Sequence, residues 1–124
     1  MTPERPLPTD DEIERQVVRL YRRLGWRQSV YVRLRFRLAP LVDTARLVAQ
    51  GGPVLDLGCG QGMFTHVLRA FDADRQIVGI DTDQRRIHVA RTVATDDRLS
   101  FRVGDARDFD LANATHVTLI DLLH

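Results

Sequence analysis

The chain has 124 residues, 44% of them hydrophobic, and a formal net charge of +1 at pH 7, which fits one domain with a single core and excludes two domains. No apolar run approaches the roughly 18 residues that a membrane span needs, and the proline-rich, acidic start lacks the pattern of a signal peptide. Cys59 is the only cysteine, which excludes a disulfide framework and a cysteine-rich metal site, so we expect a soluble, cytoplasmic protein.

The first predicted element is an amphipathic helix over residues 10–24. Thr9 and Glu12 have the spacing of a capping box, and Gly25 follows the helix. The apolar residues on its predicted inner face are Ile13, Val17, Leu20, Tyr21 and Leu24.

The next segment is ambiguous, because its apolar residues alternate with arginine like a strand but also fit helical spacing. The residues with helical spacing are Tyr31, Leu34, Leu38 and Leu41. We predict a helix, since Pro40 can then occupy the first position of a further helix that ends at Gly51 and Gly52.

The two N-terminal helices carry a basic surface. Eight arginines and no acidic residue stand from Arg15 to Arg37. Such a segment could bind nucleic acid, with Trp26, Tyr31 and Phe36 available for base stacking. We favour the simpler interpretation, in which the arginines form the solvent-exposed faces of two helices.

Strands and helices alternate from Pro53 onward, at a spacing that predicts βαβ units and a parallel sheet. Val54, Leu55 and Leu57 form the apolar run of a strand that is covered on both faces. Further strands are predicted at 76–81, 99–103 and 115–120, with helices at 63–71 and after Asp83. The sequence therefore predicts an α/β fold.

A glycine turn joins the first strand to the helix that begins at Met63. Gly58, Gly60 and Gly62 stand at alternate positions, so the backbone can adopt positive φ angles and approach a ligand closely. The helix then directs its first N–H groups toward an anionic or polar group. The dinucleotide fingerprint G-x-G-x-x-G would need a third glycine at position 63, so a pyrophosphate-binding turn is disfavoured.

The three later strands each end at an aspartate, namely Asp81, Asp105 and Asp121. Because parallel strands of a doubly wound sheet end at one edge, these carboxylates should converge beside the glycine turn. Asp81 lies about 20 residues beyond the glycines, where an acid can accept hydrogen bonds from ribose hydroxyls. Asp83 is better placed to cap the next helix, which leaves Asp81 for the ligand.

Three segments in order resemble motifs of the class I S-adenosylmethionine-dependent methyltransferases. Residues 54–62 resemble motif I, residues 78–83 resemble motif II, and residues 101–106 resemble the motif that receives adenine. The resemblance implies a Rossmann-like parallel sheet with strand order 3-2-1-4, preceded by N-terminal helices. A full class I domain has seven strands, so this chain is similar to its N-terminal part and lacks strands five to seven.

The resemblance also implies that two regions of the chain have different roles. Residues 1–51 would form a helical cap with an arginine-rich face, and residues 52–124 the half that binds S-adenosyl-L-methionine. In that half Asp81 would bind the ribose, Asp105 and the Ala106 N–H would bind adenine, and Asp121 would face the sulfonium and the substrate. The backbone of the glycine turn would hold the methionine portion, and Asp56 would orient the turn and reach the methionine amine. The full expected set of cofactor-binding residues is Asp56, Gly58, Cys59, Gly60, Gly62, Asp81, Thr82, Asp105, Ala106 and Asp121.

The implied function is that of an S-adenosylmethionine-dependent methyltransferase, or of its cofactor-binding part, with a small-molecule acceptor that the sequence does not identify. Methyl transfer from a sulfonium needs alignment and water exclusion more than acid–base chemistry, so the lack of a catalytic triad is compatible with it. The four histidines show no ligand spacing, and we expect no metal site. One alternative is a non-catalytic module that binds S-adenosylmethionine or S-adenosylhomocysteine and acts through a partner. Another is a nucleic-acid-binding protein that uses the segment from Arg15 to Arg37.

The predicted fourth strand suggests self-association. Strand order 3-2-1-4 leaves this strand at an edge of the sheet, and its residues Val117, Leu119 and Ile120 are apolar. An edge without proline, lysine or an internal charge tends to recruit another strand. We therefore expect a homo-oligomer that forms through this edge.

Overall fold

The computed structural model describes residues 6–48, 52–72, 74–94, 96–108 and 116–118. The helices are α1 (Asp10–Arg22), α2 (Trp26–Leu38), α3 (Leu41–Leu47), α4 (Met63–Phe71) and α5 (Gln84–Val93). The strands are β1 (Val54–Leu57), β2 (Ile77–Asp81), β3 (Leu99–Val103) and β4 (His116–Thr118), and Ala106–Asp108 forms a short 3-10 turn. The predicted alternation of strands and helices after position 53 is therefore confirmed.

The four strands form one parallel sheet in the order β3-β2-β1-β4, as predicted. All residues of β1 are buried, and its apolar side chains enter clusters on both faces of the sheet. Val54 packs into the larger core with α4, whereas Leu55 and Leu57 form a smaller cluster with Ile80. The parallel register brings the carboxyl ends of β1, β2 and β3 to a common edge.

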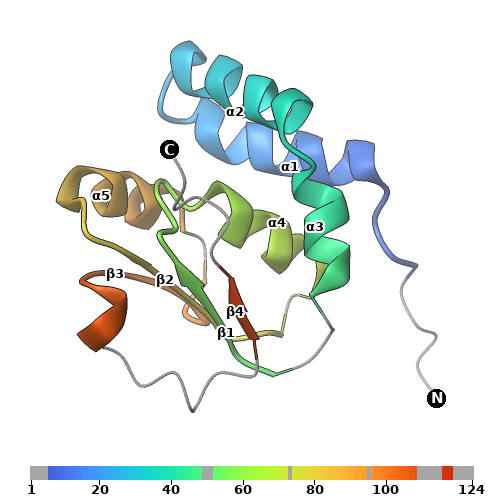
Figure 1. Cartoon of the computed structure of the whole chain (residues 1–124). Helices are drawn as coiled ribbons and strands as arrows, with labels where there is room; N and C mark the ends of the chain where they lie inside the picture. Colours follow the sequence, from blue (N-terminus) through green and yellow to red (C-terminus); the bar gives the residue numbers. More distant parts are fainter. Residues whose placement is uncertain (1–5, 49–51, 73, 95, 109–115, 119–124) are drawn as a thin grey trace.

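The N-terminal helices α1 and α3 pack on α4, which itself contacts the sheet. α1 lies between α2 and α4, and α3 also packs on α4, so that α2 is the outermost helix (Figure 1). The predicted capping box is present, because the Thr9 and Glu12 side chains each accept a hydrogen bond from the other's backbone N–H. α1 ends at Arg22, two residues before the predicted end. The division into a cap over 1–51 and a second half over 52–124 stays a prediction.

The second segment is a helix, but of the four apolar residues that predicted it only Leu41 is buried, and Leu41 belongs to α3. Ser29 and Val32 are the buried residues of α2, whereas Tyr31, Leu34 and Leu38 are exposed. A short polar side chain can be buried there because the Ser29 hydroxyl donates a hydrogen bond to the carbonyl of Trp26, 2.8 Å away. Helical spacing thus identified the element correctly without indicating its inner face.

The third helix differs from its prediction at both ends. Pro40 is the N-cap of α3 and not its first residue, since its backbone (φ −80°, ψ 61°) is not helical. The helix ends at Leu47, because the backbone of Val48 is already extended, and so it stops before the predicted end at Gly51 and Gly52. Smaller differences concern the strands: β2 begins at Ile77 and not at 76, and positions 115, 119 and 120 of the predicted fourth strand lie outside the described residues.

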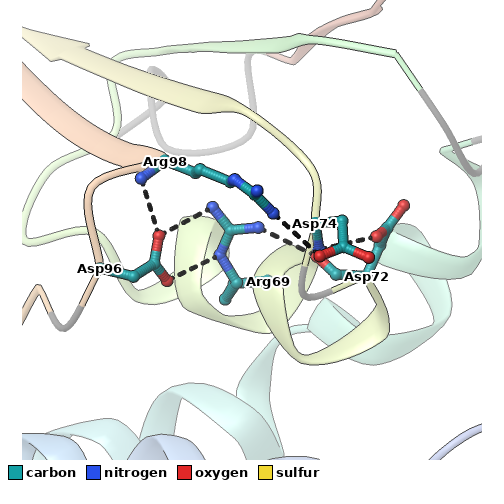
Figure 2. Close-up of polar contacts among 5 residues, drawn as sticks. All are labelled: Arg69, Asp72, Asp74, Asp96 and Arg98. Atoms are coloured by element: carbon teal, nitrogen blue, oxygen red, sulfur yellow. Dashed lines mark hydrogen bonds and ion pairs between the residues drawn. The ribbon is translucent and has the colours of Figure 1, made fainter.

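A charged cluster joins the loops at the amino ends of β2 and β3 (Figure 2). The guanidinium of Arg69 at the end of α4 pairs with Asp96 at 3.2 Å and donates to the carbonyl of Asp72 at 3.0 Å. Arg98 pairs with Asp74 at 2.8 Å, and its backbone N–H donates to Asp96. Because ligands of such sheets bind at the opposite edge, we assign this cluster to stability.

Candidate cofactor site

The glycine turn between β1 and α4 has the predicted backbone conformation. Gly58, Gly60 and Gly62 have φ angles of 69°, 58° and 87°, and they alternate with residues of negative φ. The backbone N–H groups of Gly58 and Cys59 both donate to the carbonyl of Ile80, at 2.7 and 3.0 Å, which fastens the turn to the end of β2. The Cys59 side chain is fully buried within the turn.

Gly62 is required by packing as well as by its φ angle. A Cβ atom at this position would lie 2.7 Å from the ring of Phe101 and 3.2 Å from the Cβ of Ala90. The ring of Phe101 on β3 also covers Gly79 of β2, where a Cβ atom would again lie 2.7 Å away. The first turn of α4 can therefore approach the sheet only because position 62 has no side chain.

The N-terminal helices stabilise the glycine turn through a hydrogen bond that the sequence did not predict. The hydroxyl of the buried Tyr21 on α1 donates a hydrogen bond to the carbonyl of Gln61, 2.5 Å away. Helical spacing placed Tyr21 only on the apolar face of α1. A long-range hydrogen bond of this kind leaves no local signal in the sequence.

Asp81 ends β2 and is buried against the glycine turn. One carboxylate oxygen accepts the backbone N–H of Gly60 at 2.9 Å, and the other accepts the backbone N–H of Asp83 at 2.8 Å. Asp83 caps α5 as predicted, by accepting from the N–H groups of Arg85 and Arg86. The cap is thus supplied by Asp83 and not by Asp81, as predicted, and Asp81 has a further structural contact that was not predicted, its hydrogen bond to the glycine turn.

Asp56 lies in the interior, below the glycine turn. Its two carboxylate oxygens accept hydrogen bonds from the hydroxyls of Thr65 on α4 and Thr118 on β4, both at 2.8 Å. All three side chains are buried, so the network links β1, α4 and β4. The sequence did not single out either threonine, since their positions become meaningful only when the strands are paired.

A cavity of about 190 Å³ opens at the carboxyl edge of the sheet. It is lined by Leu57, Gly58, Ile80, Asp81, Thr82, Gly104 and Asp105. Four of the predicted site residues, Gly58, Asp81, Thr82 and Asp105, thus line one cavity. Ala106 follows directly at the start of the 3-10 turn, whereas Asp121 lies outside the described residues.

Asp105 is held by its neighbour Arg107. The guanidinium contacts both carboxylate oxygens, at 2.8 and 3.1 Å, and the Arg107 backbone N–H donates at 2.9 Å. The side-chain hydrogen bonds and then the backbone hydrogen bond lower the pKa of Asp105 to about 2. The carboxylate therefore stays ionised and fixed at the rim of the cavity.

A second cavity of about 320 Å³ lies on the α2 side of the same turn. It is lined by Tyr31, Arg35, Cys59, Gly60, Gln61, Met63 and Arg86. Sequence reasoning missed Tyr31, Arg35 and Arg86 as site residues, because nothing local indicates that α2 passes over the glycine turn. Among the described residues, no group of three His, Cys, Asp or Glu side chains is arranged to hold a metal ion.

Comparison with known proteins identifies the family. A family profile described as "Methyltransferase domain" matches residues 49–123, which is more than half of the chain. The chain belongs to this family. The predicted resemblance to the class I S-adenosylmethionine-dependent methyltransferases and the predicted Rossmann-like fold are both confirmed.

Two solved structures share the fold, and a third shows local sequence similarity. A protein-L-isoaspartate O-methyltransferase is similar with a TM-score of 0.51 and 16% identity, over 64% of this chain and 27% of that chain. The glycopeptide N-methyltransferase MtfA has a TM-score of 0.50 and 22% identity, over 63% of this chain and 39% of its own. The bifunctional kinase-methyltransferase WbdD is 36% identical over 55% of this chain and 16% of its own, with a TM-score of 0.42.

This methyltransferase domain spans less than half the length of each of these solved chains. A comparison with curated protein sequences finds no match. Over the described part of the domain, no helix has the length and apolarity to cross a membrane.

Proposed function

We propose that this methyltransferase domain binds S-adenosyl-L-methionine at the carboxyl edge of β1, β2 and β3 and serves methyl transfer to a small-molecule acceptor. The observation that carries the proposal is the position of Asp81. Its carboxylate holds the glycine turn through Gly60 and also lines the 190 Å³ cavity next to Asp105. One side chain thus joins the turn proposed for the methionine portion to the cavity proposed for the nucleoside.

The roles we propose follow from the chemistry of these groups. Each carboxylate oxygen can accept about two hydrogen bonds, so Asp81 retains acceptor capacity for ribose hydroxyls after binding Gly60 and Asp83. Asp105, with the adjoining Ala106 N–H, would recognise the adenine edge, and Thr82 lines the same cavity. The fixed backbone of Gly58, Cys59, Gly60 and Gly62 would hold the methionine portion. Roles for Asp56 at the methionine amine and Asp121 near the sulfonium complete the proposal.

The cofactor would supply a methyl group that is already activated as a sulfonium. The protein then has to bind, orient and exclude water, which needs no catalytic triad. Proteins with this fold are described as an O-methyltransferase and an N-methyltransferase. The fold therefore does not determine whether the methyl acceptor is an oxygen or a nitrogen atom. The cavity on the α2 side of the turn is one place where an acceptor could approach Gly60 and Met63.

Isothermal titration calorimetry with S-adenosylmethionine and S-adenosylhomocysteine tests the proposal. We expect binding of both ligands, and NAD should bind at least about tenfold more weakly, a difference of about 1.4 kcal/mol. The reason is that position 63 carries methionine where the dinucleotide turn needs glycine. Absence of binding at millimolar ligand would refute the cofactor assignment. Equal competition by NAD would refute the choice of cofactor while leaving a nucleotide site in place.

A further inference from the structure

The outward face of α2 carries an apolar stripe. Four residues spaced by four positions, Trp26, Val30, Leu34 and Leu38, are 71%, 50%, 51% and 73% exposed, and we call them the outer stripe. Residues at this spacing lie along one face of a helix. Figure 1 shows α2 as the outer helix with α1 beneath it, and the exposed fractions place these four side chains away from α1. An apolar stripe on an exposed helix typically marks an interaction surface.

A basic groove runs between α1 and α2. It encloses about 300 Å³ and is lined by Glu14, Arg15, Val18, Arg19, Arg22 and Arg33. Over the described parts of the chain, Arg19, Arg22 and Arg33 have no carboxylate partner, and Arg15 donates a hydrogen bond to a carbonyl of its own helix. Like charges spaced by three or four residues on a helix repel one another. An anion bound in the groove would reduce this repulsion among the arginines.

The groove borders the outer stripe. Arg33 follows Val30 by three positions and immediately precedes Leu34, so the basic and the apolar surfaces meet along α2. Arg37 continues the basic side one turn further, and α2 itself contains no acidic residue. The combined surface is therefore apolar along its centre and cationic along its margin.

We propose that this face binds the surface of an anionic phospholipid bilayer, with α2 lying in the plane of the interface. The outer stripe enters the boundary between headgroups and acyl chains, and the arginine groove binds lipid phosphates. Burial of apolar side chains at the headgroup boundary and attraction of basic side chains to anionic lipids both contribute to the binding of a helix at a membrane surface. The lipid phosphate is a diester, which is also the anion that guanidinium groups bind well.

Two other occupants fit the surface less well. A second copy of the chain would bring two arginine-rich margins together, and their repulsion opposes the apolar gain. A nucleic-acid duplex would satisfy the arginines but would leave the aliphatic side chains of Val30, Leu34 and Leu38 without an apolar partner. Only a surface that is both anionic and apolar can bind the arginine groove and bury the outer stripe at the same time. The proposal does not depend on the cofactor site.

The fluorescence of Trp26 provides a direct test, because it is the only tryptophan of the chain. The protein is mixed with vesicles of phosphatidylcholine alone and with vesicles that contain 30 mol% phosphatidylglycerol, at low and at physiological salt. We expect flotation with the anionic vesicles, together with a blue shift of the tryptophan emission. Binding should weaken as salt rises, and the neutral vesicles should bind far less.

Matched variants separate the two halves of the surface. Leu34→Gln should lower the affinity for anionic vesicles at least fivefold, and the double variant Arg19→Gln with Arg33→Gln about 25-fold, since each arginine near such a surface contributes about fivefold. The exposed residues Leu47 on α3 and Arg85 on α5 supply controls, and Leu47→Gln and Arg85→Gln should change the affinity less than twofold. Circular dichroism verifies that every variant is folded.

Several outcomes would overturn the proposal. One is failure of the anionic vesicles to bind at low salt, and another is equal binding of the neutral vesicles. Tight binding of a duplex oligonucleotide by a protein that ignores vesicles would assign the groove to nucleic acid. A wild-type dimer that Leu34→Gln converts to a monomer, without vesicle binding, would assign the stripe to a second copy of the chain.

Discussion

The carboxylate of Asp81 accepts a hydrogen bond from the backbone N–H of Gly60 at 2.9 Å, although 21 positions separate the two residues. This contact ties the end of β2 to the middle of the glycine turn. The acid proposed to recognise the ribose therefore also fixes the backbone proposed to hold the methionine portion. Loss of this side chain should affect ligand affinity and the shape of the turn together.

Replacing Asp81 by alanine should weaken binding of S-adenosylhomocysteine by about 1.5–3 kcal/mol, which is roughly a tenfold to hundredfold loss. Calorimetry of both proteins measures this difference. Asp83→Ala is the matched control, because it removes the cap of α5 only two positions away and should cost about 1 kcal/mol of stability without lowering affinity. Equal affinity of Asp81→Ala and wild type would contradict the proposed role.

Two glycines of the turn should respond differently to alanine. At Gly62 the new Cβ atom would lie 2.7 Å from the Phe101 ring at a φ angle of 87°, so we expect Gly62→Ala to lose about 2–4 kcal/mol of unfolding free energy. At Gly60 no heavy atom lies within 4 Å of a new Cβ atom, and only the left-handed backbone, φ 58°, opposes alanine, at about 1–2 kcal/mol. Urea denaturation distinguishes the two values. Equal losses would show that packing against Phe101 is unimportant.

The buried His66 should make the fold sensitive to acid. Burial, aided by Arg69 and opposed by Asp96, lowers the pKa of His66 from 6.5 to about 4. Between these values the unfolded chain binds a proton that the folded chain does not. Unfolding free energy should therefore fall as the pH drops below about 6.5, by on the order of 3 kcal/mol at pH 4, and this histidine should have no effect above pH 6.5.

Comparison with His66→Phe isolates this contribution. Phenylalanine can keep the ring contacts of His66 with Tyr21 and Phe101, whose ring centroids lie 5.9 and 6.1 Å away. The variant should lose less stability than wild type between pH 6.5 and 4, whereas the exposed control His88→Gln should follow wild type. Parallel pH curves for wild type and His66→Phe would disprove the assignment.

The parts of the fold that sequence predicted well are those with local causes. β1 and α4 have the predicted bounds, because an apolar run followed by alternating glycines specifies a strand, a turn and a helix start within one short segment. The Thr9 capping box and the Asp83 cap are equally local, since each joins residues two or three positions apart. The strand order came instead from the family resemblance.

The parts that sequence missed depend on tertiary contacts. Tyr21 binds a carbonyl 40 positions away, and Thr118 binds Asp56 across 62 positions. The inner face of α2 follows from its packing on α1, which buries Ser29 and Val32 in place of the more apolar Leu34. Asp81 illustrates the same limit, because its position at the end of β2 was predictable but its hydrogen bond to the Gly60 N–H was not.

The prediction of self-association concerns β4, which lies at one end of the described sheet and pairs there only with β1. Val117 is 42% exposed, whereas Thr118 is buried and donates to Asp56, so a charge placed at position 118 would damage the interior. Leu119 and Ile120, which also motivated the prediction, lie outside the described residues. The informative substitution is therefore at position 117.

We expect the chain to self-associate through the β4 edge, because among the described strands β4 pairs only with β1, so its outer edge and Val117 can meet a second copy and continue the sheet. Val117→Arg should weaken this association at least about tenfold, or 1.4 kcal/mol, since two arginines would face each other across a symmetric contact. Val103→Arg is the matched control, because Val103 is 41% exposed on β3 at the opposite end of the sheet. Sedimentation equilibrium of the three proteins measures the change. A wild-type monomer at several hundred micromolar, or equal effects of the two substitutions, would show that β4 is not the interface.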